Sequence, residues 1–203
     1  MKLYYAKGTA ALPVHIALEE TGAAYDTQVL DFAKGEQQSA AYLAINPKGR
    51  VPALAVEDGI LTEALAILGY IAQSFPNAAL APTDPFGFAR AMAFNGYLAS
   101  TVHVAHAHKR RGARWADDAA THDAMRAKVA QNMTDCARVI EAHYLDGPWV
   151  LGDSYSICDP YLFTITRWMP ADGVDMSEFS RLTAHTEAMM QRPAVQRVVA
   201  LHS

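Results

Sequence analysis

Hydrophobic positions in the first 75 residues recur with two alternating periods, one typical of strands and the other typical of helices. Short apolar runs or alternation with a period of two predict strands, whereas apolar residues three and four apart predict helices. The elements predicted in this way are, in chain order, strand 3–6, helix 12–21, strand 25–30, helix 39–44, strands 53–56 and 60–62, and helix 63–75. This order is typical of a thioredoxin-like domain, in which helices cover a mixed sheet.

Turn and capping residues support these boundaries. Pro13 is tolerated only in the first turn of the first helix, and Gly22 ends that helix. Asp58-Gly59 between two apolar runs predicts a tight hairpin, because glycine accepts the positive φ of such a turn. Thr62 is a favourable N-cap residue for the helix that follows.

The hydrophobic pattern changes after residue 75. Residues 76–87 contain Pro76, Pro82 and Pro85, which cannot sustain a helix or a central strand, so this segment is predicted to be a linker. Only helical spacing follows it, in the ranges 88–108, 121–144, 159–168, 181–192 and 194–201. We therefore predict a thioredoxin-like α/β domain over residues 1–75, a linker over 76–87 and an all-α helical domain over 88–203.

Composition and charge narrow the functional classes. Of the 203 residues, 51% are hydrophobic and 19% are charged, which is ordinary for a folded globular protein. The formal net charge of −4 offers no basic surface for nucleic acid or anionic lipid, so neither is an expected partner. One basic cluster, Lys109-Arg110-Arg111 with Arg114, is interpreted as a helix end whose cations complement the helix dipole, and a phosphate-binding patch is the alternative.

The sequence predicts a cytoplasmic protein. The opening Met1–Tyr5 is too short for a signal peptide, and no run approaches the roughly 18 apolar residues that a spanning helix needs, so no membrane association is expected. The two cysteines, Cys136 and Cys158, form no C-x-x-C pair. That absence excludes a dithiol redox site and favours a reducing compartment.

The most specific motif is Asn46-Pro47-Lys48-Gly49-Arg50-Val51-Pro52-Ala53-Leu54, a turn that leads into a strand at Pro52. A cis Val51–Pro52 bond would direct the backbone N–H and C=O of Val51 outward, where they could pair with another extended backbone. The alternative is a proline that merely begins an edge strand. About ten residues later Thr62-Glu63-Ala64 opens a helix, whose first free N–H groups attract a carboxylate.

With these motifs the chain resembles the glutathione transferases, most closely their bacterial beta class, and the resemblance spans the whole chain. Its further markers are Met1-Lys2-Leu3-Tyr4-Tyr5, His15-Ile16-Ala17-Leu18-Glu19-Glu20 and Ser156-Ile157-Cys158-Asp159-Pro160-Tyr161-Leu162-Phe163. The last of these segments is similar to the family's N-capping box, in which Ser156 caps a helix and Asp159 reaches back to the Ser156 N–H.

The resemblance implies glutathione as a co-substrate and no metal. In the family, the backbone at Val51-Pro52 holds the cysteinyl part of glutathione, and Glu63 with the helix start at Ala64 holds the γ-glutamyl end. Glu63 can accept from the ammonium, and the Ala64 N–H can donate to the α-carboxylate. Many relatives have serine at the position of Ala64, so one hydrogen bond is absent here. Lys34 lies where relatives place a lysine near the glycyl carboxylate.

The chain departs from the beta class around the glutathione sulfur. Relatives carry a cysteine in the loop after the first strand, where this chain reads Gly8-Thr9-Ala10-Ala11, so Ala10 occupies the cysteine position. Ala10 can neither form a mixed disulfide with glutathione nor bond its sulfur. Thr9 is therefore a candidate hydrogen-bond donor to the sulfur, and Tyr5 is the alternative.

A second catalytic candidate lies in the helical domain. The stretch Tyr97-Leu98-Ala99-Ser100-Thr101-Val102-His103 matches a beta-class segment whose histidine faces the sulfur, so the resemblance assigns that role to His103. A structural or solvated histidine is the alternative. Gly96 and Val104 replace an asparagine and a lysine of the relatives. A metal site at His103, His106 and His108 is not predicted, because no carboxylate or cysteine lies at ligand spacing.

The leading functional interpretation is an enzyme, a glutathione transferase that favours the thiolate of glutathione and adds it to a small hydrophobic electrophile. One alternative is a catalytically weak glutathione-binding protein, which Ala10, Gly96 and Val104 suggest. Another is a specialised glutathione-dependent isomerase, lyase or dehalogenase, because a fold does not determine its chemistry. The resemblance also implies a homodimer and a role in detoxification.

Overall fold

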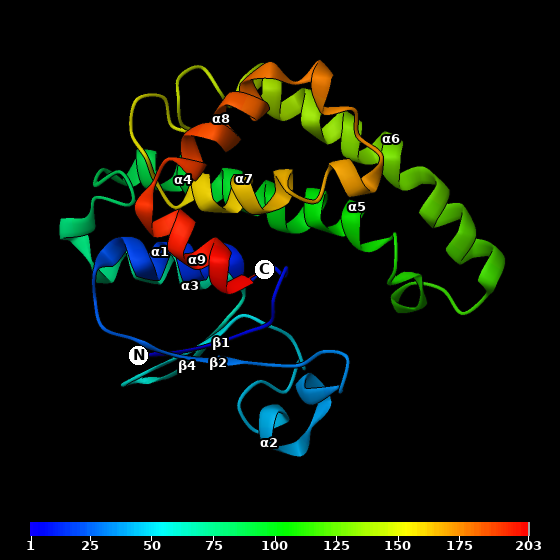
Figure 1. Cartoon of the computed structure of the whole chain (residues 1–203), viewed down its shortest axis with the longest axis horizontal. Helices are drawn as coiled ribbons and strands as arrows, with labels where there is room; N and C mark the ends of the chain where they lie inside the picture. The colour runs from blue at the N-terminus through cyan, green and yellow to red at the C-terminus, as the bar shows by residue number, and fades with distance from the viewer. Residues whose placement is uncertain (203) are drawn as a thin grey trace.

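The computed structural model describes residues 1–202, and Figure 1 shows how its elements are arranged. The strands are β1 (Lys2–Tyr5), β2 (Asp26–Val29), β3 (Ala53–Val56) and β4 (Gly59–Thr62). The helices are α1 (Leu12–Thr21), α2 (Ala40–Leu43), α3 (Ala64–Ser74), α4 (Pro85–Tyr97), α5 (His103–Ala107), α6 (Ala119–His143), α7 (Cys158–Thr166), α8 (Ser180–Met190) and α9 (Pro193–His202). Within residues 1–202, no helix combines the length and the apolar character needed to cross a membrane.

The four strands form one mixed sheet in the order β2-β1-β3-β4. β1 and β2 are parallel, with Leu3 opposite Thr27, and α1 makes the crossover between them. β1 with β3 and β3 with β4 are antiparallel, and the predicted hairpin joins β3 to β4 through a turn at Glu57-Asp58, directly before Gly59, whose φ is 141°. This topology, followed by helices from Pro85 onward, confirms the predicted fold class.

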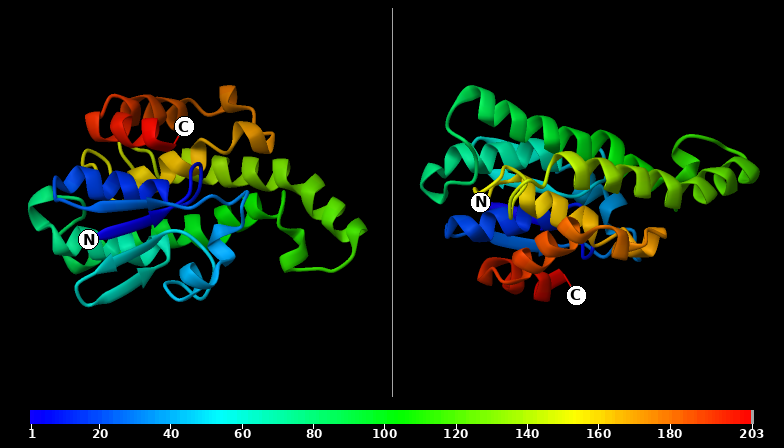
Figure 2. Two further views of the ribbon diagram at one scale, coloured as in Figure 1. Left: turned by 60° about the horizontal axis from the view of Figure 1, so that its bottom comes forward. Right: turned by 90° about the horizontal axis from the view of Figure 1, so that it is seen from above.

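The helical part of the chain is docked onto the sheet-bearing part through α1. Figure 1 shows α1 and α3 on one side of the strands and α2 on the other. α7 and α9 both contact α1, and the further views in Figure 2 show α9 lying beside α1. Leu12 and Ile16 of α1 form one buried cluster with Phe163 of α7 and with Val195 and Val198 of α9. Burial of this apolar surface joins the first helix of the chain to its last.

The predicted linker is shorter than expected. α4 begins at Pro85, inside the range 76–87, because proline suits the first turn of a helix. The Asp84 carboxylate caps that turn by accepting from the Gly87 N–H at 2.7 Å. The other predicted elements occur with ends within two residues of the prediction, apart from the helix expected at 88–108, which is interrupted as described below.

Asp159, at the start of α7, is fully buried and holds the preceding chain in place. Its Oδ2 accepts from the Ser156 N–H at 2.7 Å and from the Ser156 hydroxyl at 3.1 Å, and its Oδ1 accepts from the Val150 N–H at 2.9 Å. His185 Nε2 of α8 lies 3.1 Å from the same Oδ1. The Ser156 hydroxyl oxygen accepts from the Cys158 N–H at 3.2 Å. The expected capping box is therefore present, and it extends to α8.

Replacing Asp159 by alanine should lower the free energy of unfolding by about 2–5 kcal/mol, because buried donors lose their acceptor. Urea denaturation followed by far-ultraviolet circular dichroism measures the change. The matched control is Asp135→Ala on α6, whose carboxylate pairs with Arg138 at 2.9 Å but is 55% exposed. That control should cost less than about 1 kcal/mol. Equal losses in the two variants would contradict the role assigned to Asp159.

Candidate active site

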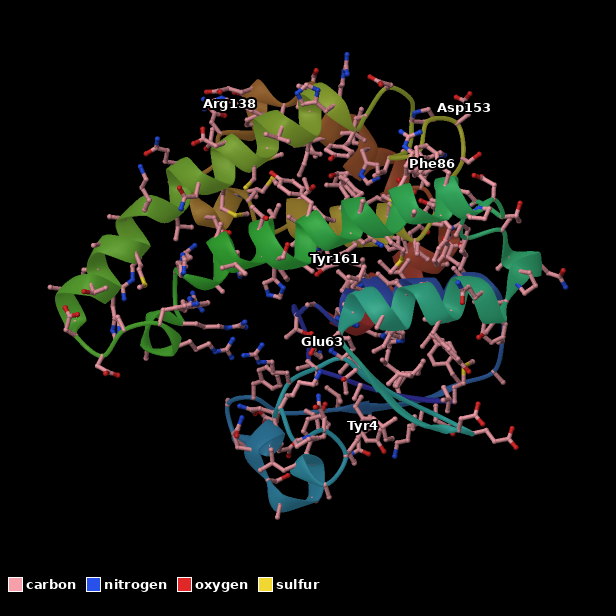
Figure 3. All side chains as sticks on the ribbon, turned by 180° about the vertical axis from the view of Figure 1, so that it is seen from behind. Tyr4, Glu63, Phe86, Arg138, Asp153 and Tyr161 are labelled. Atoms are coloured by element: carbon pink, nitrogen blue, oxygen red, sulfur yellow. The ribbon has the colours of Figure 1, made fainter. Side chains whose placement is uncertain are left out.

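A cavity of about 680 Å³ lies where the sheet-bearing part meets the helical part. One wall consists of the loop between β1 and α1, the segment that leads into β3, and the start of α3. The facing wall consists of residues around α5, the turn that follows it, and α7. Figure 3 labels Glu63, directly before α3 on the first wall, and Tyr161, on α7 in the second wall, and both line the cavity.

The segment before β3 brings Val51 and Pro52 to the cavity, and the peptide bond between them is cis, as predicted. The preceding turn is anchored at the Arg50 carbonyl, which accepts from the Tyr42 hydroxyl and from Asn46 Nδ2, both at 2.7 Å. Gly49 has a φ of 60°, and a Cβ there would lie 2.5 Å from Gln38 Nε2. Glycine is therefore favoured at this turn, chiefly because of the positive φ, since the Gln38 side chain could move to make room.

The start of α3 forms the next part of the same wall. Glu63, rather than Thr62, occupies the N-cap position, because Thr62 is the last residue of β4. Glu63 has a φ of 70°, a conformation that costs a residue other than glycine about 1–3 kcal/mol. Its carboxylate forms an ion pair with the Lys48 ammonium. Glu63, Ala64 and Leu65 all line the cavity, so the free N–H groups of the first helical turn adjoin it.

The loop between β1 and α1 contributes Gly8, Thr9 and Ala10 to the cavity. The Thr9 hydroxyl donates to the Ala6 carbonyl at 2.7 Å and accepts from the Ala11 N–H at 3.3 Å. Its single proton is thus directed at the backbone of its own loop. Ala10 presents only a methyl group.

Tyr5, the alternative sulfur donor, is directed elsewhere. Its side chain is buried, with ring centroids 5.1 Å from His15 and 4.8 Å from His202. Tyr5 is not one of the cavity-lining residues within 1–202.

His103 reaches the cavity because the helix that carries it changes its winding. The backbone from Leu98 to Val102 is π-helical, and the His103 N–H donates to the Leu98 carbonyl five residues back. Such an insertion turns the following residues around the helix axis and is frequent at functional sites. The half-buried ring lies 5.1 Å from the Trp168 ring. Burial, followed by the nearby Arg111 guanidinium, lowers the pKa of His103 to about 4, so its imidazole is neutral at pH 7.

His106 lines the cavity but is held by its own partners. Its ring stacks on Trp168 at 4.5 Å, and its Nδ1 lies 2.6 Å from Oδ2 of the buried Asp172. Lys109 also bonds Asp172, through Oδ1 at 3.1 Å. Within residues 1–202, no group of three or more histidine, cysteine, aspartate or glutamate side chains has the arrangement of a metal site.

Lys34 lies outside the cavity wall that residues 1–202 form. Its side chain is 74% exposed and pairs with Asp31 at 3.2 Å. Gln37 and Gln38, which the sequence analysis did not single out, line the cavity on this side. The role of Lys34 at a glycyl carboxylate stays a prediction.

Three arginines of the cavity wall were not recognised as site residues from the sequence. Arg50 comes from the turn before β3, and Arg111 and Arg114 come from the turn after α5. α5 ends at Ala107, and the Arg111 N–H still donates to the Ala107 carbonyl, so the cluster directly follows a helix end, and its role as dipole-complementing cations stays a prediction. The sequence shows the basic cluster, but it does not show that the turn brings Arg111 and Arg114 to the cavity.

Comparisons with known proteins agree with this geometry. The model of a family described as "Glutathione S-transferase, N-terminal domain" matches residues 1–73. The Escherichia coli O157:H7 protein named glutathione S-transferase GstA is 32% identical over 97% of this chain and 96% of its own length. A solved glutathione transferase homolog from Sulfitobacter, with bound glutathione, is 46% identical, with a TM-score of 0.95 over 98% of this chain and 97% of that chain.

A bacterial beta-class glutathione S-transferase from Sphingomonas chungbukensis is also similar. It is 33% identical, with a TM-score of 0.87 over 100% of this chain and 99% of that chain. These likenesses cover the sheet-bearing and the helical parts together. The chain therefore belongs to the glutathione S-transferase family.

Proposed function

We propose that this transferase binds glutathione in the cavity, keeps its sulfur as a thiolate beside His103, and adds that sulfur to a small hydrophobic electrophile. The observation that carries the proposal is the convergence of Val51, Glu63, Ala64 and His103 on one cavity, although they come from different segments of the chain.

Backbone groups and one carboxylate make up the proposed glutathione grip. The N–H and C=O of Val51 pair with the cysteinyl part of glutathione, as an added strand would. The first N–H groups of α3, beginning at Ala64, receive the γ-glutamyl carboxylate. Glu63 accepts from the γ-glutamyl ammonium and shares its charge with Lys48. Pro52 is buried and holds the cavity wall at this point.

Activation of the thiol is assigned to His103. A thiol has an unperturbed pKa near 8.5, so an enzyme at neutral pH must favour the thiolate. The neutral imidazole of His103 can donate its N–H to the sulfur without competing for its proton. The guanidiniums that disfavour a positive charge on His103 also favour a negative charge on a neighbouring sulfur. Thr9 could donate to the sulfur only by releasing the Ala6 carbonyl, so we give it the lesser role.

Other features of the proposal follow family resemblance and composition. A homodimer and a role in detoxification are proposed from the family resemblance. A cytoplasmic location fits a protein whose two cysteines, Cys136 and Cys158, are both free and buried. The proposed division of the chain places the glutathione grip in residues 1–75 and the electrophile side in residues 88–203.

Two other functions have specific support. Ala10, Gly96 and Val104 at positions where beta-class enzymes carry polar groups favour a catalytically weak glutathione-binding protein. A glutathione-dependent isomerase is the other candidate, because a Pseudomonas aeruginosa relative named maleylacetoacetate isomerase is 28% identical over 97% of this chain. Product analysis distinguishes the two enzymes, since an isomerase returns glutathione unchanged and a transferase consumes it.

The purified protein should bind glutathione and transfer it to a chlorinated nitroaromatic compound. Isothermal titration measures the first property, and release of chloride with loss of free thiol measures the second. Binding without turnover across several electrophiles would favour the weak binding protein, and absence of binding would refute the proposal. Ser154→Ala, a substitution outside the cavity, controls for preparation effects.

Replacing His103 by alanine should lower kcat/KM about 10- to 100-fold, the effect of losing one hydrogen bond to a charged sulfur. The thiolate absorbance of glutathione bound to this variant, followed against pH, should show a higher thiol pKa than in the wild type. In the wild type, rate should rise with pH through the thiol pKa alone, because His103, with a pKa of about 4, is already neutral from pH 5 upward. The control is the exposed His143→Ala. An unchanged thiol pKa in the His103 variant would rule out the assigned role.

Replacing Ala10 by cysteine should restore a thiol that forms a mixed disulfide with glutathione, because Ala10 lies on the cavity wall at the approach to α1. Mass spectrometry after incubation with oxidised glutathione detects the added glutathionyl group. Ala24→Cys, on an exposed loop, is the control and should react more slowly. Equal rates for the two variants would show that Ala10 does not adjoin the bound sulfur.

A further inference from the structure

Three guanidinium groups from two different walls share the cavity. Arg50 belongs to the sheet-bearing wall, and Arg111 and Arg114 belong to the turn between α5 and α6. Figure 3 shows side chains tipped with nitrogen that project from this turn toward the sheet-bearing part. The groups are close enough to influence one another, since burial and then Arg50 lower the pKa of Arg111, and burial, Arg50 and Arg111 lower the pKa of Arg114.

These guanidiniums have no carboxylate partner within residues 1–202. Five other arginines have such a partner, namely Arg126, Arg138, Arg181, Arg192 and Arg197, whereas Arg90, Arg110 and Arg167, outside the cavity wall of residues 1–202, do not. Among residues 1–202, Glu63 is the one acidic residue of the cavity wall, and it is already paired with Lys48. A cluster of like charges without a counter-charge is unfavourable, and it creates a positive potential that attracts anions into the cavity.

Glutathione alone does not balance this charge. Its γ-glutamyl end carries one carboxylate and one ammonium, which the proposed grip places at α3. The glycyl carboxylate and the thiolate then bring two negative charges toward three guanidiniums. Arg50 directly precedes Val51 and therefore lies on the glutathione side. Arg111 and Arg114 lie on the helical side, where the proposed function places the electrophile.

We infer that the electrophilic substrate carries an anionic group, a carboxylate or a similar oxyanion, which Arg111 and Arg114 bind. The planar guanidinium is suited to this role because it donates two parallel hydrogen bonds to a carboxylate. Trp115 and Phe32, both partly exposed on the cavity wall, supply apolar contact for the body of the substrate. The inference rests on the proposed function and replaces a purely hydrophobic electrophile with an amphiphilic one.

A matched pair of substrates tests the inference. A chloronitrobenzoate and its methyl ester carry the same chlorine, and in both the thiolate sulfur forms the new C–S bond while chloride leaves with the bonding electron pair. The two rates are each divided by the uncatalysed rate with glutathione in the same buffer, which removes the difference in intrinsic reactivity. In the wild type, the normalised kcat/KM should be about 10-fold or more higher for the acid than for the ester. This is the effect expected of one hydrogen bond between charged groups. Added salt should reduce this preference.

Variants assign the preference to particular residues. Arg111→Gln and Arg114→Gln should each lower the acid-to-ester ratio of kcat/KM about 10-fold. Arg110→Gln is the control, because Arg110 is exposed and is not among the residues of 1–202 that line the cavity. A role of Arg111 and Arg114 only in glutathione binding or thiol ionisation would slow both substrates equally and leave the ratio unchanged, which would overturn the inference.

The failures of the two proposals are distinguishable. Equal normalised rates for the acid and the ester in the wild type refute the anionic substrate but leave the transferase intact. Absence of turnover with both compounds, together with absence of glutathione binding, refutes the proposed function itself. If a variant does not fold, competition by an unreactive benzoate against the ester in the wild type decides the question, and lack of competition counts against the inference.

Discussion

The buried carboxylate of Asp159 connects three parts of the helical region: the chain at Val150 and Ser156, the first turn of α7, and His185 on α8. A carboxylate without exposure to water is tolerated only when its lone pairs are occupied, so these contacts constrain one another. α7 in turn packs on α1, and the same helix carries Tyr161 into the cavity wall. The position of the helical wall relative to the sheet-bearing wall therefore depends on this network.

In the proposed function the two walls use different chemistry. The sheet-bearing wall would act mainly through backbone, at Val51 and at the start of α3, and backbone groups place little demand on side-chain identity. The helical wall would act through side chains, chiefly His103, Arg111 and Arg114, all of which line the cavity. Variation on the helical wall can thus change the electrophile while the grip on glutathione persists, which explains how one fold serves several glutathione-dependent reactions.

In the proposed mechanism, the electrostatics of the cavity take the place of the cysteine that beta-class relatives carry. Ala10 offers nothing to a sulfur, and the Thr9 hydroxyl is bonded to the Ala6 carbonyl. The arginines that keep His103 neutral also stabilise a thiolate electrostatically, without a cysteine that forms a disulfide with the sulfur. If the electrophile is anionic, as we infer, the same field acts on it and gives Arg111 and Arg114 a role in substrate choice.

Local patterns in the sequence determined the element order, the cis Val51–Pro52 turn and the capping box, because each depends on residues a few positions apart. They also pointed to the proposed glutathione grip, whose groups belong mainly to the backbone. Only the tertiary structure decided which side chains line the cavity and which are held away from it. The π-helical insertion that orients His103, the N-cap position of Glu63, the burial of Tyr5 and the inward turn of Arg111 and Arg114 all depend on packing between distant segments. Local propensity cannot specify such directions, because a shift of one residue in helix winding moves a side chain from one face to another.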